Sequence, residues 1–344
     1  MTPPKKRKAR KSAPAAPAAP VYAGLTPDVV LDAVESAGYR CDGRQSALNS
    51  YENRVFQVWL EDDRALVAKF YRPARWSDAA IDEEHAFAAE LAAREIPVVA
   101  PLADTAGHTL HTHAGFRFAV YPKKPGRTPE LEHEDVLQWL GRFLGRIHVV
   151  GRQRDFKERP SLDPDTFGYD SLDYLLDEGK LPPALHEAYA AIGDQVLVAV
   201  GQRFEAAGEL DWIRTHGDCH AGNMLWTEGG PHFVDLDDCR MAPAVQDLWM
   251  LLPGDRPNAT RALTAVLRGY REFAEFETRE LLLIEPLRAL RMLHYSAWLA
   301  RRWDDPAFPA AFPWFGTERY WQDQILALRE QLAALAEPPL EAAW

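Results

Sequence analysis

The 344-residue sequence has few cysteines and no long hydrophobic run. Its three cysteines, Cys41, Cys219 and Cys239, form no CxxC pair and have no Cys/His metal-ligand spacing. This sparse set argues against a disulfide framework and indicates a reducing compartment. No apolar run approaches the roughly 18 residues of a membrane span, and the basic N-terminus is not followed by the apolar stretch of a secretory signal. We therefore expect a cytoplasmic protein without a membrane partner.

Basic residues are also scarce outside the N-terminus. The net charge is −12, and residues 1–20 contain six lysines and arginines but no acid. The rest of the chain thus contains 33 of the 39 basic residues and all 51 acidic residues. A body this acidic argues against nucleic acid as the main partner. It is compatible with a cationic substrate, although a generic soluble surface explains it equally well.

The first 22 residues have a composition of their own. Their "PKKRKARK" run resembles a nuclear localisation signal or a nucleic-acid-binding arm, but such runs are more often solvated tails, which is the interpretation we favour. The Ala/Pro repeats that follow cannot bury enough apolar area to offset the entropy of ordering. We predict a disordered tail over residues 1–22.

Two different hydrophobic patterns follow the tail. Thr26 and Pro27 are typical of a helix start. The next segments predict strands at 53–60, 64–71 and 115–122 and a helix at 78–94. From residue 130 the sequence consists mainly of long amphipathic helical patterns. We therefore predict an α+β, bilobal fold of the protein-kinase type, with a β-rich N-lobe over 23–121 and a helical C-lobe over 122–344.

The most polar residues of the helical half lie in two short loops, "HGDCHAGN" (216–223) and "FVDLDD" (233–238). Asp218 and Asn223 have the five-residue spacing of the protein-kinase catalytic loop, in which the acid accepts the proton of the attacking hydroxyl and the amide holds magnesium. The segments "MLW" and "HFV" flank a Gly/Pro turn and predict a hairpin, which would bring Asp235 beside Asn223. Asp218 and Asp235 are thus the candidate catalytic acids, and Asn223 and Asp235 the candidate magnesium ligands.

Other polar residues near these loops allow more than one interpretation. His216 and His220 have a zinc-binding spacing only on a helix, which the neighbouring glycines disfavour. Cys219 could be a nucleophile but is better explained as a small loop residue. Asp237 and Asp238 could supply a secondary ligand or could face solvent or cap the turn. Asp247 is a candidate anchor for the loop backbone. Each pattern alone is weak, and the hypothesis depends on the loop, the hairpin and Asp235 together.

The N-terminal half offers candidates for nucleotide binding. Lys69 in "ALVAKF" precedes a helix whose Glu84 shares a face with apolar residues and is favoured over Glu83 as its ion-pair partner. The strand "GFRFAVYP" resembles an interlobe hinge, where the backbone near Val120 and Tyr121 would bind adenine. No G-x-G-x-x-G precedes Lys69. The stretch "LNSYENRVFQV" would have to cover the phosphates through backbone N–H groups and the Ser50 hydroxyl.

These motifs carry a family resemblance. "HGDCHAGN" with "FVDLDD" is similar to the Brenner-type motif of the aminoglycoside phosphotransferase/choline kinase superfamily, which has the bilobal protein-kinase-like fold. From about residue 25 onward, "VAKFYRPARW", "FVDLDDCRMAPAVQDLWMLL" and "RRWDDPAFPAAFPWF" more closely resemble the bacterial stress response kinase A family. The resemblance implies ATP- and Mg²⁺-dependent phosphorylation of protein serine and threonine, with autophosphorylation, during envelope and oxidative stress.

Carried onto this chain, the resemblance makes Asp218 the proton acceptor, Asn223 and Asp235 the magnesium ligands, and Ser50 and Lys69 the contacts to ATP. The alternative is a small-molecule kinase that acts on an amino alcohol or an aminoglycoside-like cation, because the same core serves both reactions. Pro243 follows only eight positions after Asp235, which is too short for a long activation segment and keeps that alternative open. A nucleotide-binding pseudokinase is disfavoured because no catalytic group is missing. No long heptad seam is present, so we expect a monomer.

Overall fold

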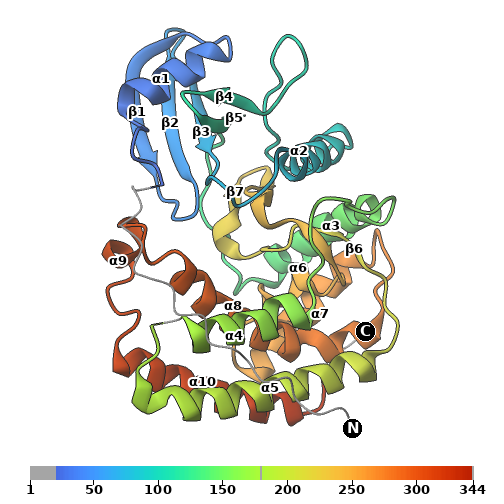
Figure 1. Cartoon of the computed structure of the whole chain (residues 1–344). Helices are drawn as coiled ribbons and strands as arrows, with labels where there is room; N and C mark the ends of the chain where they lie inside the picture. The colour runs from blue at the N-terminus through green and yellow to red at the C-terminus, as the bar shows by residue number, and fades with distance from the viewer. Residues whose placement is uncertain (1–20, 179, 343–344) are drawn as a thin grey trace.

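The computed structural model describes residues 21–178 and 180–342, which form two lobes (Figure 1). The smaller N-terminal lobe holds an antiparallel five-stranded sheet and two helices, and the larger lobe is mostly helical. The predicted α+β bilobal fold is thereby confirmed. Among the described residues, no helix is both long and apolar enough to cross a membrane. The predicted disordered tail lies outside the described residues except for its last two, Val21 and Tyr22.

The N-lobe sheet has the strand order β1-β2-β3-β5-β4. Its strands are β1 (Cys41–Leu48), β2 (Arg54–Leu60), β3 (Ala65–Phe70), β4 (His111–His113) and β5 (Phe116–Pro122). Side chains alternate between the two faces of a strand. In β3, Ala68 and Phe70 therefore pack in the core under helix α1 (Pro27–Ser36), and Val67 and Lys69 face a pocket on the other side. Alternation thus places Lys69 in the space between the lobes.

Both N-lobe helices begin at a side-chain cap. Thr26 Oγ1 accepts a hydrogen bond from the Val29 N–H at the start of α1, as the sequence predicts. Ser77 Oγ accepts one from the Ala80 N–H at the start of α2 (Asp78–Ala93). Tyr22, which the sequence analysis assigned to the tail, donates to the backbone carbonyls of Glu52 and Phe70 and so packs with this lobe.

The C-lobe is built from helices of very different length, which Figure 1 shows below the sheet. They are α3 (Glu134–Gly151), α4 (Asp170–Asp177), α5 (His186–Ala207), α6 (Gln246–Trp249), α7 (Arg256–Tyr270), α8 (Ile284–Arg301), α9 (Ala307–Ala311) and α10 (Glu318–Ala336). Helices α3 and α7 pack so closely that a Cβ on Gly141 or on Gly269 would collide with the backbone of the other helix. Glycine is therefore needed at the α3–α7 crossing.

Two short strand pairs carry the polar loops of this lobe. Strand β6 (Ile213–Thr215) pairs with β9 (Arg240–Ala242), and β7 (Met224–Thr227) pairs with β8 (Gly230–Phe233). The hairpin that the sequence predicts from "MLW" and "HFV" is thus confirmed. Val98, just after α2, forms a bridge with Phe233, and this contact joins the hairpin to the N-lobe.

The sequence patterns do not reveal strand β1 or helix α4. β1 is an edge strand whose side chains are mostly exposed and polar, so it has no apolar alternation to detect. α4 is only 8 residues long, too short for a clear helical period. Beyond Tyr270 the apolar residues continue, but the chain leaves helix α7 in a turn.

Candidate active site

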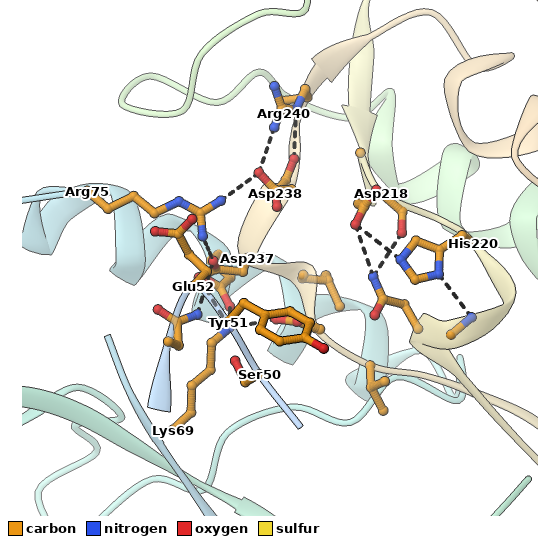
Figure 2. Close-up of a pocket in the computed structure, with 18 of the residues that line it drawn as sticks. Ser50, Tyr51, Glu52, Lys69, Arg75, Asp218, His220, Asp237, Asp238 and Arg240 are labelled. Carbon is orange, nitrogen blue, oxygen red and sulfur yellow. Dashed lines mark hydrogen bonds and ion pairs between the residues drawn. The ribbon is translucent and has the colours of Figure 1, made fainter. Parts of the chain in front are cut away.

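A cavity of about 920 Å³ lies between the lobes and is lined by residues from both (Figure 2). Its size is that of a site for a small-molecule ligand or nucleotide. The cavity brings together most of the site residues predicted from the sequence, namely Ser50, Lys69, Glu84, Tyr121, Asp218, Asn223 and Asp235. It does not include Val120.

The polar loop between β6 and β7 is anchored from below by Asp247. Its carboxylate accepts hydrogen bonds from the backbone N–H groups of His216 (2.7 Å) and Gly217 (2.8 Å), and His148 Nε2 lies 3.0 Å from Oδ2. Asp247 is fully buried. Burial alone would raise its pKa, but the hydrogen bond and charge of His148 and the bonds to His216 lower it overall. This geometry confirms that Asp247 anchors loop backbone.

Removing this anchor should destabilise the loop and the protein together. Asp247→Ala leaves two buried N–H groups unpaired, which costs about 1–3 kcal/mol for each. We expect the free energy of unfolding in urea to fall by about 2–5 kcal/mol and turnover to fall with it. Because the pKa of Asp247 is lowered in the folded protein, its contribution is present above the unfolded pKa of about 3.9 and is lost as pH falls through the folded value.

The matched control is Asp255→Ala, which removes another backbone-capping aspartate, at the exposed start of α7. It should cost about 1 kcal/mol and leave turnover unchanged. If Asp247→Ala unfolded and turned over like the wild type, the anchoring role would be wrong.

Asp218 follows Gly217 and projects into the cavity. Its Oδ1 lies 2.6 Å from Nη1 of Arg291 on α8, and its Oδ2 lies 3.4 Å from His220 Nε2. Burial would raise the pKa of Asp218, but the hydrogen bond from His220 and the charge of Arg291 outweigh it and hold the pKa below its usual range. The carboxylate is therefore ionised at neutral pH and able to accept a proton. The sequence analysis missed Arg291, because nothing in the local pattern links α8 to this loop.

The two histidines of the loop do not form a zinc pair. His216 is buried and its Nε2 lies 3.0 Å from the carbonyl oxygen of Val234. His220 Nδ1 accepts from the Gly222 N–H, 2.9 Å away, at the start of a short 3-10 turn (Ala221–Asn223). The two rings have separate partners in a non-helical loop, as the glycines predict.

The hairpin brings Asn223 and Asp235 to the same edge of the cavity. Met224 pairs with Phe233, and the Val234 N–H donates to the Asn223 carbonyl at 3.0 Å, so Asp235 follows directly beside Asn223. Asp235 has φ 60°, a left-handed conformation that a non-glycine residue adopts at a cost. Asn223 Nδ2 donates to the backbone carbonyl of Asp218 at 3.0 Å. Its amide oxygen is left for another ligand.

This donor set suits a magnesium ion that also binds phosphate. The described residues contain no cluster of three or more His, Cys, Asp or Glu side chains that could hold a metal. Magnesium needs no such cluster, because it prefers oxygen ligands and is usually bound by one or two carboxylates together with substrate phosphates. The side chain of Asp235 is half exposed to the cavity, and Asn223 supplies an amide oxygen. The two residues therefore fit the ion in a nucleotide complex.

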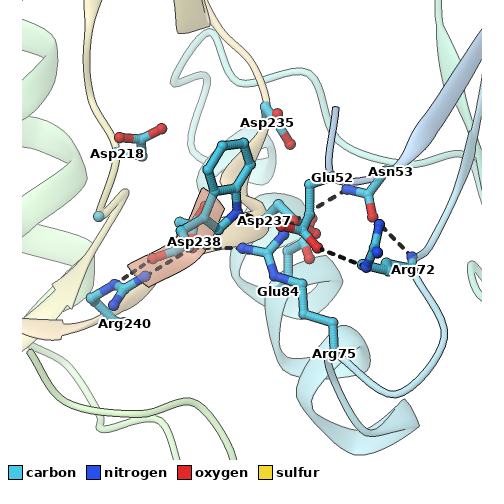
Figure 3. A network of polar contacts seen from close by, with 12 residues as sticks. Glu52, Asn53, Arg72, Arg75, Glu84, Asp218, Asp235, Asp237, Asp238 and Arg240 are labelled. Atoms are coloured by element: carbon cyan, nitrogen blue, oxygen red, sulfur yellow. Dashed lines mark hydrogen bonds and ion pairs between the residues drawn. The ribbon is translucent and has the colours of Figure 1, made fainter. Parts of the chain in front are cut away.

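Asp237 and Asp238 are each paired with arginine (Figure 3). Arg75 forms ion pairs with both carboxylates, and Arg240 pairs with Asp238 at 2.8 Å. Burial would raise the pKa of Asp238, but these two arginines lower it strongly. Both acids are thus bound by arginines in the cavity wall; the Asp237 side chain is buried, whereas that of Asp238 is 33% exposed.

Lys69, on strand β3, lies close to three acidic side chains. Its Nζ lies 2.8 Å from Asp235, 3.2 Å from Asp237 and 3.6 Å from Glu84. Burial acts to lower the pKa of Lys69, but the three carboxylates outweigh it and raise the pKa well above the ordinary value. Lys69 is therefore positively charged and placed for an anionic ligand.

The two helix glutamates have different partners. Glu84 points inward, as predicted, and its main partner is Arg159 at 2.6 Å. Glu83 instead accepts the backbone N–H groups of residues 157–159. Arg159 also donates to the carbonyl of Asp237 at 2.6 Å. Helix α2 is thereby tied to the C-lobe through Arg159, which the sequence analysis missed.

Val120 does not lie in the cavity, and the hinge prediction has to be shifted. Its side chain is buried in the N-lobe core, and its carbonyl already accepts the Leu102 N–H at 2.7 Å. The cavity wall at this position is formed by Tyr121 and the next three residues, Pro122, Lys123 and Lys124. Any adenine contact from the hinge would come from this later segment.

Comparison with known proteins gives concordant results. Residues 44–284 match the phosphotransferase enzyme family. Stress response kinase A of Escherichia coli (strain K12) is 46% identical over 317 residues, which is 92% of this chain and 95% of that protein. Serine/threonine protein kinase RdoA of Salmonella typhimurium (strain LT2) is 46% identical with the same coverage. The structure of amicoumacin kinase hAmiN, solved with AMP-PNP, Ca²⁺ and Ami, superposes with a TM-score of 0.69 at 20% identity, covering 89% of this chain and 93% of that one.

Proposed function

Since the chain belongs to the phosphotransferase enzyme family, and within it to the stress response kinase A group, we propose that it is an ATP- and Mg²⁺-dependent serine/threonine protein kinase. It transfers the γ-phosphoryl group of ATP to a protein hydroxyl, phosphorylates itself, and acts in the cytoplasm during stress. The observation that carries the proposal is one cavity in which an ionised Asp218, the Asn223–Asp235 pair and a charged Lys69 face each other.

The proposed roles follow from position. Asp218 orients the acceptor hydroxyl and receives its proton as the new O–P bond forms and the bond between the γ-phosphorus and the ADP oxygen breaks. Asn223 and Asp235 would hold magnesium, which bridges the phosphates and neutralises their charge. Lys69, now 2.8 Å from Asp235, would contact the phosphates, and Glu84 keeps it in place. Arg291 fixes the Asp218 carboxylate through Oδ1.

The charge pairing inside the cavity supports an acceptor without a positive charge. Every carboxylate that lines it has a lysine or arginine partner, in the pairs Glu52–Arg302, Glu84–Arg159, Asp218–Arg291, Asp235–Lys69, Asp237–Arg75 and Asp238–Arg240. An ammonium group beside the base would meet Arg291 and would have to compete with it for Asp218.

A second candidate is a kinase for a small amino alcohol or aminoglycoside-like cation. The connection from Asp235 to Pro243 contains only a 3-10 turn and strand β9, so it offers no long segment against which a peptide could be aligned. The similarity to hAmiN shows a common fold at 20% identity and does not decide between acceptors.

The first test is phosphoryl transfer from γ-labelled ATP with magnesium. Generic protein acceptors and a panel of amino alcohols and aminoglycosides are offered in parallel, with magnesium chelated in a matched reaction. We expect label on serine or threonine of protein, including this chain, and none without the metal. Label confined to a small cationic alcohol would overturn the protein acceptor while leaving the phosphotransferase chemistry intact.

A further inference from the structure

The loop that should cover the phosphates contains no glycine, and its backbone N–H groups have no acceptor among the described residues. We call residues 49–53, between β1 and β2, the phosphate loop; the sequence there is "NSYEN". The carbonyl oxygens of Tyr51 and Asn53 accept from Arg54, and that of Glu52 accepts from Tyr22. Among the described residues, no group accepts from the backbone N–H groups of residues 50–53. The loop lines the cavity, and these N–H groups have no partner among the described residues, while three of the loop's carbonyl oxygens are already bound.

Glu52 ties this loop to the C-lobe (Figure 3). Trp298 Nε1 on α8 donates to Glu52 Oε2 at 2.6 Å, and Arg302 Nε forms an ion pair with the same oxygen at 2.5 Å. On the N-lobe side, Arg72 Nε lies 3.6 Å from Glu52 Oε1. The Glu52 side chain is only 11% exposed, so water does little to screen these interactions.

A second contact lies just beyond α8. Asp305 is buried and accepts from Arg72 at 2.9 Å and from Arg54 at 3.5 Å. Arg54 is the residue whose guanidinium also holds the loop carbonyls. At the loop tip, the ring of Tyr51 packs on Phe312 with centroids 4.8 Å apart. We call Trp298, Arg302, Asp305 and Phe312 the C-lobe clamp.

We infer that the C-lobe clamp holds the phosphate loop in its nucleotide-binding form, with Glu52 and Asp305 as positioning residues for ATP. A glycine-rich loop reaches its ligand by backbone freedom, whereas this loop is fixed by side chains from the opposite lobe. The clamp lies in the segment "RRWDDPAFPAAFPWF" and its preceding helix, for which the catalytic core gives no role. The inference rests on the proposed function, since it assigns the loop to ATP phosphates.

A double-mutant cycle on the Glu52–Trp298 contact tests the inference. Trp298→Phe removes the N–H donor and keeps an aromatic ring, and Glu52→Gln keeps the shape and removes the charge. We expect each variant to raise the Kd for the Mg²⁺ complex of AMP-PNP about tenfold, since a hydrogen bond to a charged group has roughly that effect. The Kd of the double variant should be no higher than that of the weaker-binding single variant. In turnover, KM for ATP should rise, with kcat and the KM for the acceptor changed much less.

Two further measurements separate positioning from mere stability. Arg142→Ala breaks an exposed ion pair between α3 and Glu272, in the turn after α7, that lies away from the cavity, and it should leave the Kd unchanged. If the Glu52 and Trp298 variants melted earlier but bound the nucleotide like the wild type, the clamp would be structural and the inference wrong. If the wild type itself failed to bind the Mg²⁺–AMP-PNP complex, the proposed function would be wrong at its first step.

Discussion

Asp218→Asn should lower kcat by about 10²- to 10⁴-fold and leave the Kd for Mg²⁺–ATP within about twofold, because proton acceptance by a positioned side chain contributes that factor to the rate alone. The amide has the shape of the carboxylate but cannot take the hydroxyl proton. Asp218 pairs with Arg291, while the proposed contacts to the nucleotide come from Ser50, Lys69 and Asp235. Nucleotide binding and phosphoryl transfer should therefore separate in this variant.

The variant should remain folded, so that the loss is chemical. Arg291, the main partner of the Asp218 carboxylate, has a side chain that is 43% exposed, so its guanidinium can turn to water when the carboxylate is removed. We expect circular dichroism and the melting temperature to stay close to those of the wild type. Rapid single-turnover kinetics with saturating ATP would show whether the chemical step is slowed. Full turnover by a correctly folded Asp218→Asn protein would exclude Asp218 as the base.

The parts of the fold that the sequence predicts are those with a strong local period. Strands β2, β3 and β5 and helix α2 each carry an apolar pattern of their own, and the structure has them within a few residues of the expected bounds. The edge strand β1 has no buried alternation to reveal it. Local patterns were therefore sufficient for the two-lobe architecture and insufficient at its edges.

The same distinction applies to the candidate site. Asp218, Asn223 and Asp235 lie within one loop and one hairpin, so their spacing along the chain already determines their proximity. The arginines that neutralise the cavity come from distant segments: Arg291 from α8, Arg159 from the loop after α3, and Arg75 from the loop after β3. No local pattern links these residues to the acids. Charge balance in a buried site is a property of tertiary packing, which spacing along the chain does not predict.

The other large effect is expected for magnesium dependence. Asp235→Asn should raise the magnesium concentration needed for half-maximal ATP binding by at least about 10- to 100-fold. Loss of a residue that only supports a metal ligand weakens metal binding by about that factor, and here a charged ligand itself is removed. Asparagine tolerates the left-handed backbone of this position, at φ 60°, better than most residues. The substitution thus changes charge without adding backbone strain. Isothermal titration with ATP at stepped magnesium concentrations measures the shift.

Asp237→Asn is the matched control, two residues further along the same turn. The side chain of Asp235 is 50% exposed, whereas that of Asp237 is 5% exposed and is enclosed by Arg75, Lys69 and Asn53. A metal ion can reach the first carboxylate but would have to displace three partners from the second. Asp237→Asn should therefore lower the melting temperature and leave the half-maximal magnesium concentration within about twofold, since removal of one partner from a buried ion pair costs stability. Equal shifts in magnesium dependence for the two variants would contradict the assignment of Asp235 as the ligand.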